Sequence, residues 1–259
     1  MTDPDLSITD YDTWVMDLDD TLYPPDNGLA EQMKAHIRDY LRAFYGTDEA
    51  GARRIQSDLM ANHGTILRGL MVTRNIDPAD FLAFERRIDY SALRSDPPLA
   101  EALSVLPGRK LVYTNGSAWH AEQTLSRLGL SEHFDGVFDI LAGGLVPKPH
   151  PDSYARFVER YAIDPTRAMM FDDRSANLAV PSQLGMATVL VSGPAGSRPA
   201  PYELLGPRRW RTWDVVGLLR SLTGEALRPS TTQEAIHRTS SPSVSEATAS
   251  TRKPRARPN

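Results

Sequence analysis

The chain has 259 residues, of which 41% are hydrophobic and 24% charged, and its formal net charge at pH 7 is -4. This length can bury a sizeable core, and the acidic balance argues against nucleic acid as the main ligand. The sequence contains no cysteine, which excludes disulfides, thiolate metal sites and cysteine nucleophiles. It shows neither an apolar run of membrane-spanning length nor a signal-peptide pattern, so we expect a cytoplasmic protein.

The first predicted strand is a short apolar run, Thr13 to Met16, which is followed at once by carboxylates. A continuous apolar run of this kind is typical of a strand that is buried on both faces. Asp17 and Asp19 stand two residues apart, so in an extended chain their side chains leave the backbone on the same side. Carboxylates held so close repel each other unless a cation lies between them or one is protonated. The pattern indicates either a metal site or a solvated acidic loop.

Between residues 27 and 93 the apolar side chains follow helical spacing, and no strand is predicted. One amphipathic helix begins near Leu29 and ends at Gly46. Three shorter helices follow, the last over residues 77–88 with Pro78 in its first turn. The sequence therefore predicts a helical module between two strands.

The second half of the chain alternates between predicted strands and helices. Strands are expected over residues 110–113, 134–140, 168–171 and 187–191. This alternation favours a mostly parallel sheet with helices on both faces, and such sheets bind ligands beyond the C-terminal ends of their strands. Polar residues end three of the predicted strands, and we expect them to meet at one edge: Asp17 with Asp19, Thr114 with Asn115, and Asp172 with Asp173.

From about Leu227 onward, Ser, Thr, Pro and Ala dominate, and the chain ends in a basic segment. This composition predicts a disordered tail. We therefore expect three parts: an α/β core of residues 1–24 and 96–224, a helical cap of residues 25–95, and a tail of residues 225–259.

Four segments resemble, in order, the motifs of the haloacid-dehalogenase-like (HAD) phosphohydrolases: Asp17-Leu18-Asp19-Asp20-Thr21, Thr114-Asn115-Gly116, Lys148-Pro149 and Phe171-Asp172-Asp173. The resemblance covers residues 13 to about 191. It is closest to the pyrimidine 5′-nucleotidase-like branch, in which the first motif also continues into Leu22-Tyr23-Pro24. The resemblance implies a Rossmann-like parallel sheet with an all-helical cap inserted after the first strand.

The resemblance also implies the roles of individual residues. Asp17 would be the nucleophile that forms an aspartyl-phosphate. Asp19 would protonate the leaving oxygen and then deprotonate the attacking water. Thr114 and Asn115 would bind the phosphoryl oxygens, and Lys148 would add a fixed positive charge that keeps the nucleophile ionised.

A Mg²⁺ site is implied as well. The carboxylates of Asp17 and Asp173 and the backbone carbonyl of Asp19 would hold the ion, with Asp172 binding directly or through water. One position departs from the family pattern, because Arg174 stands where a serine is usual. Its side chain could reach the phosphate or point to solvent.

Several side chains have a structural interpretation beside the functional one. Lys148 could be an ordinary loop lysine, and Asn177 could cap a helix or support the metal ligands. In the cap, His63 and Arg68 could contact a substrate or only stabilise the fold. His120, just beyond the second motif, is open to the same two interpretations.

The expected ligand is a small phosphorylated metabolite, with a pyrimidine nucleoside 5′-monophosphate as the first candidate. We expect neither nucleic acid nor a membrane as a partner, and a monomer or homodimer. The alternatives are a phosphatase or phosphomutase for another phosphorylated metabolite, and a haloacid dehalogenase. Asp19 disfavours the dehalogenase, because that reaction needs no general acid.

Overall fold

The computed structural model describes residues 8–193 and 200–224. The chain divides into two units, Met1–Ala226 and Leu227–Asn259, and every element below belongs to the first. The tail expected over residues 225–259 lies outside the described residues. None of the helices in the two described ranges has the length and apolar character that spanning a bilayer requires.

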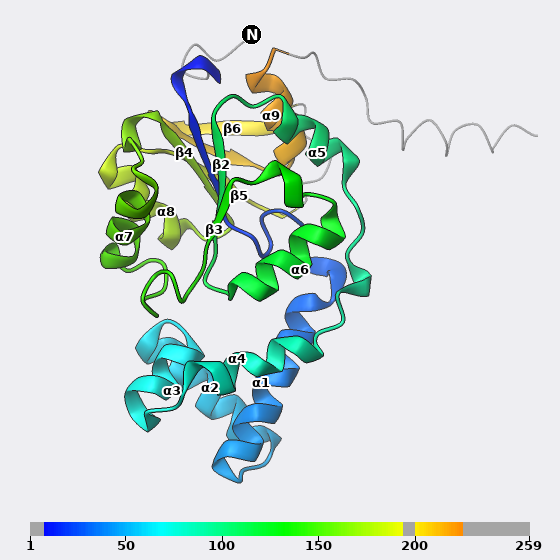
Figure 1. Ribbon diagram of the computed structural model, residues 1–259, viewed down its shortest axis with the longest axis vertical. Coiled ribbons are helices and arrows are strands. Elements are labelled where there is room, and N and C mark those ends of the chain that lie inside the picture. Colours follow the sequence, from blue (N-terminus) through cyan, green and yellow to red (C-terminus); the bar gives the residue numbers. More distant parts are fainter. Residues whose placement is uncertain (1–7, 194–199, 225–259) are drawn as a thin grey trace, which may run out of the picture. The chain divides into compact units, whose positions relative to one another are not determined.

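A sheet of seven strands in the order β3-β2-β1-β4-β5-β7-β6 forms the centre of the fold (Figure 1). Every neighbouring pair is parallel except β6 and β7, which are antiparallel. The predicted α/β fold with a mostly parallel sheet is therefore confirmed. The strands are β1 Thr13–Met16, β2 Arg109–Tyr113, β3 Gly136–Phe138, β4 Ala168–Asp172, β5 Ala187–Val191, β6 Tyr202–Gly206 and β7 Arg209–Thr212.

Helices cover both faces of this sheet. They are α5 Pro97–Ser104, α6 Ala118–Leu128, α7 Pro151–Tyr161, α8 Ser175–Leu184 and α9 Val215–Leu222. On one face Val15 of β1 lies in a buried cluster with Phe157 of α7 and Leu178 of α8. On the opposite face Trp14 lies in a cluster with Leu125 of α6. Successive residues of β1 thus point to opposite buried faces, which explains why its sequence is continuously apolar.

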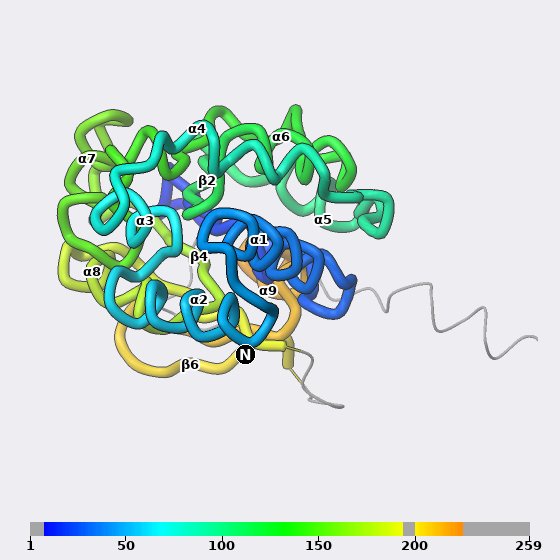
Figure 2. The backbone as a smooth tube through the Cα atoms, turned by 90° about the horizontal axis from the view of Figure 1, so that it is seen from below, coloured from blue at the N-terminus to red at the C-terminus, as the bar shows by residue number. Residues whose placement is uncertain are grey.

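Four α-helices lie within residues 27–93, where the sequence predicts a helical module: α1 Leu29–Tyr45, α2 Glu49–His63, α3 Ile66–Arg74 and α4 Pro78–Leu82 (Figure 2). Three of them begin at a polar residue whose side chain accepts a hydrogen bond from a backbone N–H of the first turn: Asp48, Thr65 and Asp77. The helix expected over residues 77–88 is shorter than predicted. It gives way to two 3₁₀ segments, Ala83–Arg87 and Tyr90–Ala92, which lead back toward the sheet.

The strand expected over residues 134–140 is also shorter, because two aspartates at its ends are engaged elsewhere. Asp135 accepts a hydrogen bond from the backbone of Lys110, and Asp139 accepts from the backbone N–H groups of Ala118 and Ala142. Only Gly136–Phe138 remains in the ladder.

Helix α5 and the C-terminal elements β6, β7 and α9 have no counterpart in the sequence prediction. Strand β6 lies at the edge of the sheet, and its Leu204 and Leu205 are exposed. An edge strand of this kind lacks the buried apolar run by which the central strands are found.

Candidate active site

The ends of three strands bring the predicted acidic and polar residues to one edge of the sheet. Strand β1 lies between β2 and β4, and all three run parallel. Asp17 follows β1, Thr114 follows β2, and Asp172 ends β4. The backbone N–H of Asp17 donates to the carbonyl of Phe171 at 2.9 Å, which continues the pairing of the two strands into the site.

Lys148 joins these strand ends through a fully satisfied ammonium group. Its side chain is only 1% exposed, and Nζ lies 2.8 Å from Asp17 Oδ1, 2.7 Å from Asp172 Oδ2 and 2.8 Å from the carbonyl oxygen of Tyr113. An ammonium group has three N–H donors, and here each has an acceptor. Lys148 is therefore not a solvated loop lysine.

Asn115 fixes the backbone of this lysine from the neighbouring loop. Its Oδ1 accepts from the Lys148 N–H at 2.8 Å, and its Nδ2 donates to the Lys148 carbonyl at 3.1 Å. The hydroxyl of Thr114 is buried and accepts from the N–H of Gly116 at 2.9 Å. Direct contacts of Thr114 and Asn115 with a phosphate stay a prediction.

Three carboxylates gather beside the lysine. Asp17, Asp172 and Asp173 each offer an oxygen, and these oxygens all lie within 4.8 Å of one another. Burial raises the pKa of Asp17 to about 7, and the charges of Asp172 and Asp19 add to this shift while Lys148 opposes it. Burial and the Asp172 charge also raise the pKa of Asp173 to about 6. The cluster therefore carries more negative charge than one ammonium compensates.

Asp172 is held by further donors from the start of α8. Its two oxygens lie 2.9 and 3.1 Å from Asn177 Nδ2, and Oδ1 also accepts from the backbone N–H of Arg174 at 2.9 Å. The Arg174 side chain is exposed, so the contact made by this residue is through its backbone. Asn177 Oδ1 is buried and has no hydrogen-bond partner among the described residues.

The Asp19 carboxylate has partners of its own. Its Oδ1 accepts a hydrogen bond from the hydroxyl of Tyr23 and lies 2.8 Å from Nε2 of His120. Burial raises the pKa of Asp19, but the charge of His120 and the hydrogen bonds from both partners outweigh burial, and the net shift is downward. Asp19 is not part of the cluster formed by Asp17, Asp172 and Asp173.

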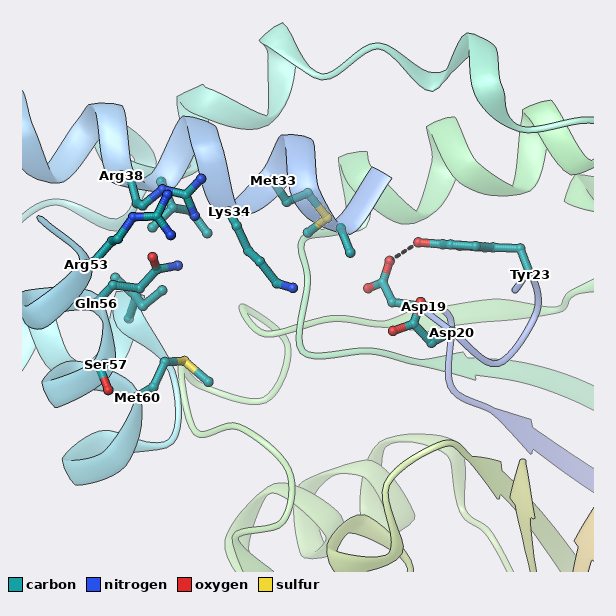
Figure 3. A pocket seen from close by; sticks show the side chains of 13 residues that line it. Asp19, Asp20, Tyr23, Met33, Lys34, Arg38, Arg53, Gln56, Ser57 and Met60 are labelled. Atoms are coloured by element: carbon teal, nitrogen blue, oxygen red, sulfur yellow. Dashed lines mark hydrogen bonds between the residues drawn. The ribbon is translucent and has the colours of Figure 1, made fainter. Parts of the chain in front are cut away.

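A pocket of about 580 Å³ opens beside Asp19 and Asp20 and extends between α1 and α2 (Figure 3). Its far end in this view is formed by Arg38, Arg53 and Gln56. Apolar side chains form much of the remaining wall: Met33, Ile37, Met60 and Ile66. His63 and Arg68, the cap residues considered from the sequence, do not line it.

A family model described as haloacid dehalogenase-like hydrolase matches residues 11–185, which hold the strand ends, the lysine and the acidic cluster. The chain belongs to this family of HAD-like hydrolases.

Two curated relatives of this HAD-like hydrolase have names that refer to phosphate. Phosphate metabolism protein 8 of Saccharomyces cerevisiae is 25% identical over 192 residues, which are 67% of this chain and 59% of that protein. Enolase-phosphatase E1 of Frankia alni is 38% identical over 104 residues, which are 38% of this chain and 40% of that protein. The matched region thus spans less than two thirds of either relative.

Solved structures share the fold at low sequence identity. A HAD phosphatase from Thermococcus onnurineus superposes with a TM-score of 0.56 at 18% identity, covering 83% of this chain and 98% of that one. A 2-haloacid dehalogenase from Pseudomonas syringae gives a TM-score of 0.51 at 19% identity, covering 83% of this chain and all of the other. A phosphatase and a dehalogenase thus share this architecture, so the fold alone does not choose between the two reactions.

Sequence reasoning did not single out His120 as a partner of Asp19. The two residues are 101 positions apart, and nothing in the local pattern connects them. The available signal was a histidine on the first turn of the helix that follows the second motif, a position close to the strand end that carries Thr114.

We expect the Lys148→Met substitution to lower the free energy of unfolding by about 3–5 kcal/mol, because it leaves two buried carboxylates without their counter-ion. Chemical denaturation at neutral pH without added divalent cations measures this. The matched control is Arg167→Met, which breaks an exposed ion pair with Asp12 and should lower the free energy of unfolding far less. Equal losses in the two variants would contradict the prediction.

Proposed function

We propose that this HAD-like hydrolase is a Mg²⁺-dependent phosphomonoesterase that acts through an aspartyl-phosphate on Asp17, with a pyrimidine nucleoside 5′-monophosphate as its substrate. The observation that carries the proposal is a buried Asp17 held by Lys148 next to the partly uncompensated carboxylates of Asp172 and Asp173. The phosphate-related names of the two curated relatives support phosphorus over carbon as the centre attacked.

The chemistry of the acidic cluster fits a hard divalent cation. Asp17, Asp172 and Asp173 supply oxygens within 4.8 Å of one another, which is the donor type that Mg²⁺ prefers. The unpartnered Oδ1 of Asn177 is a further buried acceptor beside Asp172. When bound, Mg²⁺ would neutralise the charge of the phosphate and so let a carboxylate approach phosphorus.

The residues of the chain then divide the proposed reaction between them. An oxygen of Asp17 forms a bond to phosphorus as the bond to the leaving oxygen breaks, and Asp19 gives its proton to that oxygen. In the second half, Asp19 takes a proton from water, whose oxygen attacks the phosphorus of the aspartyl-phosphate and frees both Asp17 and inorganic phosphate. Lys148 holds Asp17 Oδ1 throughout and favours its ionised form.

The pocket between α1 and α2 supports a substrate with a ring system beyond the phosphate. A volume of about 580 Å³ lies within the range of small-molecule sites. Methionine side chains such as Met33 and Met60 adapt to flat apolar faces. Arg38 and Arg53 share the single carboxylate of Glu49, at 2.9 and 3.0 Å, so the far end of the pocket keeps donors for the carbonyl oxygens of a base.

We expect the Asp17→Asn variant to lose phosphate release by roughly 10⁴-fold or more, because an amide cannot form the aspartyl-phosphate. The measurement is inorganic phosphate released from a nucleotide panel with Mg²⁺. The matched control is Asp12→Asn, which changes an exposed aspartate at the N-terminal end of β1, opposite the end that carries Asp17. This variant should keep its activity. Halide release from a 2-haloacid in the presence of a chelator, with no phosphate release from the panel, would overturn the proposal.

We expect the affinity for Mg²⁺ to rise from about pH 5 to about pH 8, because the cation binds only ionised carboxylates. The pKa of Asp17 is raised to about 7 and that of Asp173 to about 6, so in the metal-free protein both hold protons at the acidic end of this range. Calorimetric titrations in buffers of different ionisation enthalpy measure the protons released on binding. Affinity that stays constant across the range, with no proton release, would contradict this.

We expect the Met60→Trp substitution to lower kcat/KM for nucleotides by about 10-fold or more, because the larger side chain fills the pocket that would hold the base. Hydrolysis of a small ester such as glycerol phosphate should change little. Val72→Trp is the matched control, since Val72 is an exposed apolar residue of the cap that does not line the pocket. An equal loss for both substrates in Met60→Trp would argue against this pocket as the base site.

A further inference from the structure

Asp19, His120 of α6 and Tyr90 form a row of polar side chains that are linked by hydrogen bonds. Nε2 of His120 lies 2.8 Å from Asp19 Oδ1, and the other ring nitrogen, Nδ1, lies 2.7 Å from the hydroxyl of Tyr90. His120 is fully buried and Tyr90 is 5% exposed. Tyr90 belongs to the 3₁₀ segment that returns the chain from the cap, so the row connects the cap return to the first motif.

The chemistry of Asp19, His120 and Tyr23 determines which of these groups donates each hydrogen bond. An ionised carboxylate can only accept, so His120 donates through Nε2–H to Asp19 Oδ1, as the Tyr23 hydroxyl also does. In the described part of the chain no hydrogen bond reaches Asp19 Oδ2. Two donors therefore occupy Oδ1, and Oδ2 is left as the oxygen that can carry a transferable proton.

The backbone around His120 is fixed as firmly as its ring. Ser117 is the N-cap of α6, and its hydroxyl accepts from the His120 N–H at 3.2 Å. The same hydroxyl donates to the buried carboxylate of Glu85, which belongs to the other 3₁₀ segment of the cap return. Two polar contacts, one to Glu85 and one to Tyr90, thus tie the cap return to the first turn of α6.

The outgoing and returning chains of the cap are joined to each other at this place. The side-chain amide of Gln32 in α1 donates to the Asp89 carbonyl at 3.2 Å and accepts from the Asp89 N–H at 3.0 Å. Asp89 directly precedes Tyr90 in the chain. The outgoing and the returning segment of the cap therefore both help to position Tyr90, and through Tyr90 the ring of His120.

We propose that His120, braced by Tyr90, is a positioning residue that orients the Asp19 carboxyl group so that Oδ2 faces the leaving oxygen. The inference rests on the proposed phosphomonoesterase function, in which Asp19 is the general acid. A buried histidine needs hydrogen-bond partners in any case, so a purely structural role is the alternative. The two roles differ in how the loss of His120 depends on the leaving group.

The test compares kcat/KM for an aryl ester, p-nitrophenyl phosphate, with that for an alkyl ester, a nucleoside 5′-monophosphate, both with Mg²⁺. This parameter covers the steps up to release of the alcohol. A nitrophenolate leaves without a proton, whereas an alkoxide needs the general acid. We expect His120→Leu to lower kcat/KM by roughly 10²-fold for the nucleotide and by less than about 10-fold for the aryl ester.

Two further variants keep the test decisive if His120→Leu does not fold. His120→Gln retains an N–H donor near the position of Nε2 and should restore most of the nucleotide activity. Tyr90→Phe removes only the oxygen that braces Nδ1 and should lower the nucleotide reaction several-fold more than the aryl reaction. Tyr161→Phe is the matched control, because it removes a hydroxyl bound to the Val137 carbonyl away from the site and should alter neither reaction.

Equal losses for the two esters in His120→Leu and in Tyr90→Phe would overturn the proposal. Asp19→Ala separates this result from a failure of the proposed function. If Asp19→Ala is selective for the leaving group and the His120 and Tyr90 variants are not, only the positioning role is wrong. If Asp19→Ala also lowers both reactions equally, the general-acid assignment on which the inference rests is wrong.

Discussion

The buried ammonium of Lys148 is the interaction on which the site depends. Taking Asp17 and Asp172 out of water is costly, and a cation that touches both offsets much of that cost. Because the lysine also donates to the carbonyl of Tyr113, it connects the C-terminal ends of β1, β2 and β4 through one group. Asn115 holds the backbone of the lysine, so the loop that carries it cannot shift without breaking both contacts. One cation serves two of the three clustered carboxylates, and the negative charge left over is what makes the cluster suited to a second cation.

The order of the strands explains why residues so distant in sequence meet. Strand β1 is central, with β2 and β4 on either side, and the polar residue that ends each strand faces the same edge. The cap begins a few residues after Asp19, so the segment that carries this carboxylate also leads into α1. The chain returns from the cap past Tyr90, beside the helix that carries His120. Both crossings between cap and sheet are therefore connected to Asp19, the outgoing one through the chain and the returning one through Tyr90 and His120.

The central strands and the gathering of their polar ends could be predicted from the sequence, because a strand buried on both faces leaves an apolar run and a parallel sheet aligns such ends. The contacts that individual side chains make could not be predicted in this way. His120 reads as one polar residue on an amphipathic helix, and its partners Asp19 and Tyr90 lie 101 and 30 residues away. The two amide contacts of Asn115 with Lys148 likewise cross 33 residues. Strand β6 escaped prediction for a different reason, since an exposed strand at the edge of a sheet carries little apolar periodicity.

Asp17 and Asp19 are two residues apart and lie in opposite electrostatic environments. Burial raises the pKa of Asp17 to about 7, whereas His120 and the hydrogen bonds to Oδ1 give Asp19 a net downward shift. The proposed reaction requires the opposite protonation states, because Asp17 as the nucleophile must be ionised and Asp19 as the general acid must be protonated. A cation beside Asp17 favours its ionised form, and a dianionic phosphate beside Asp19 favours the protonated form. Near neutral pH the free protein therefore has Asp17 only partly ionised and Asp19 ionised, and the two ligands would shift each carboxyl group in the direction that the proposed reaction requires.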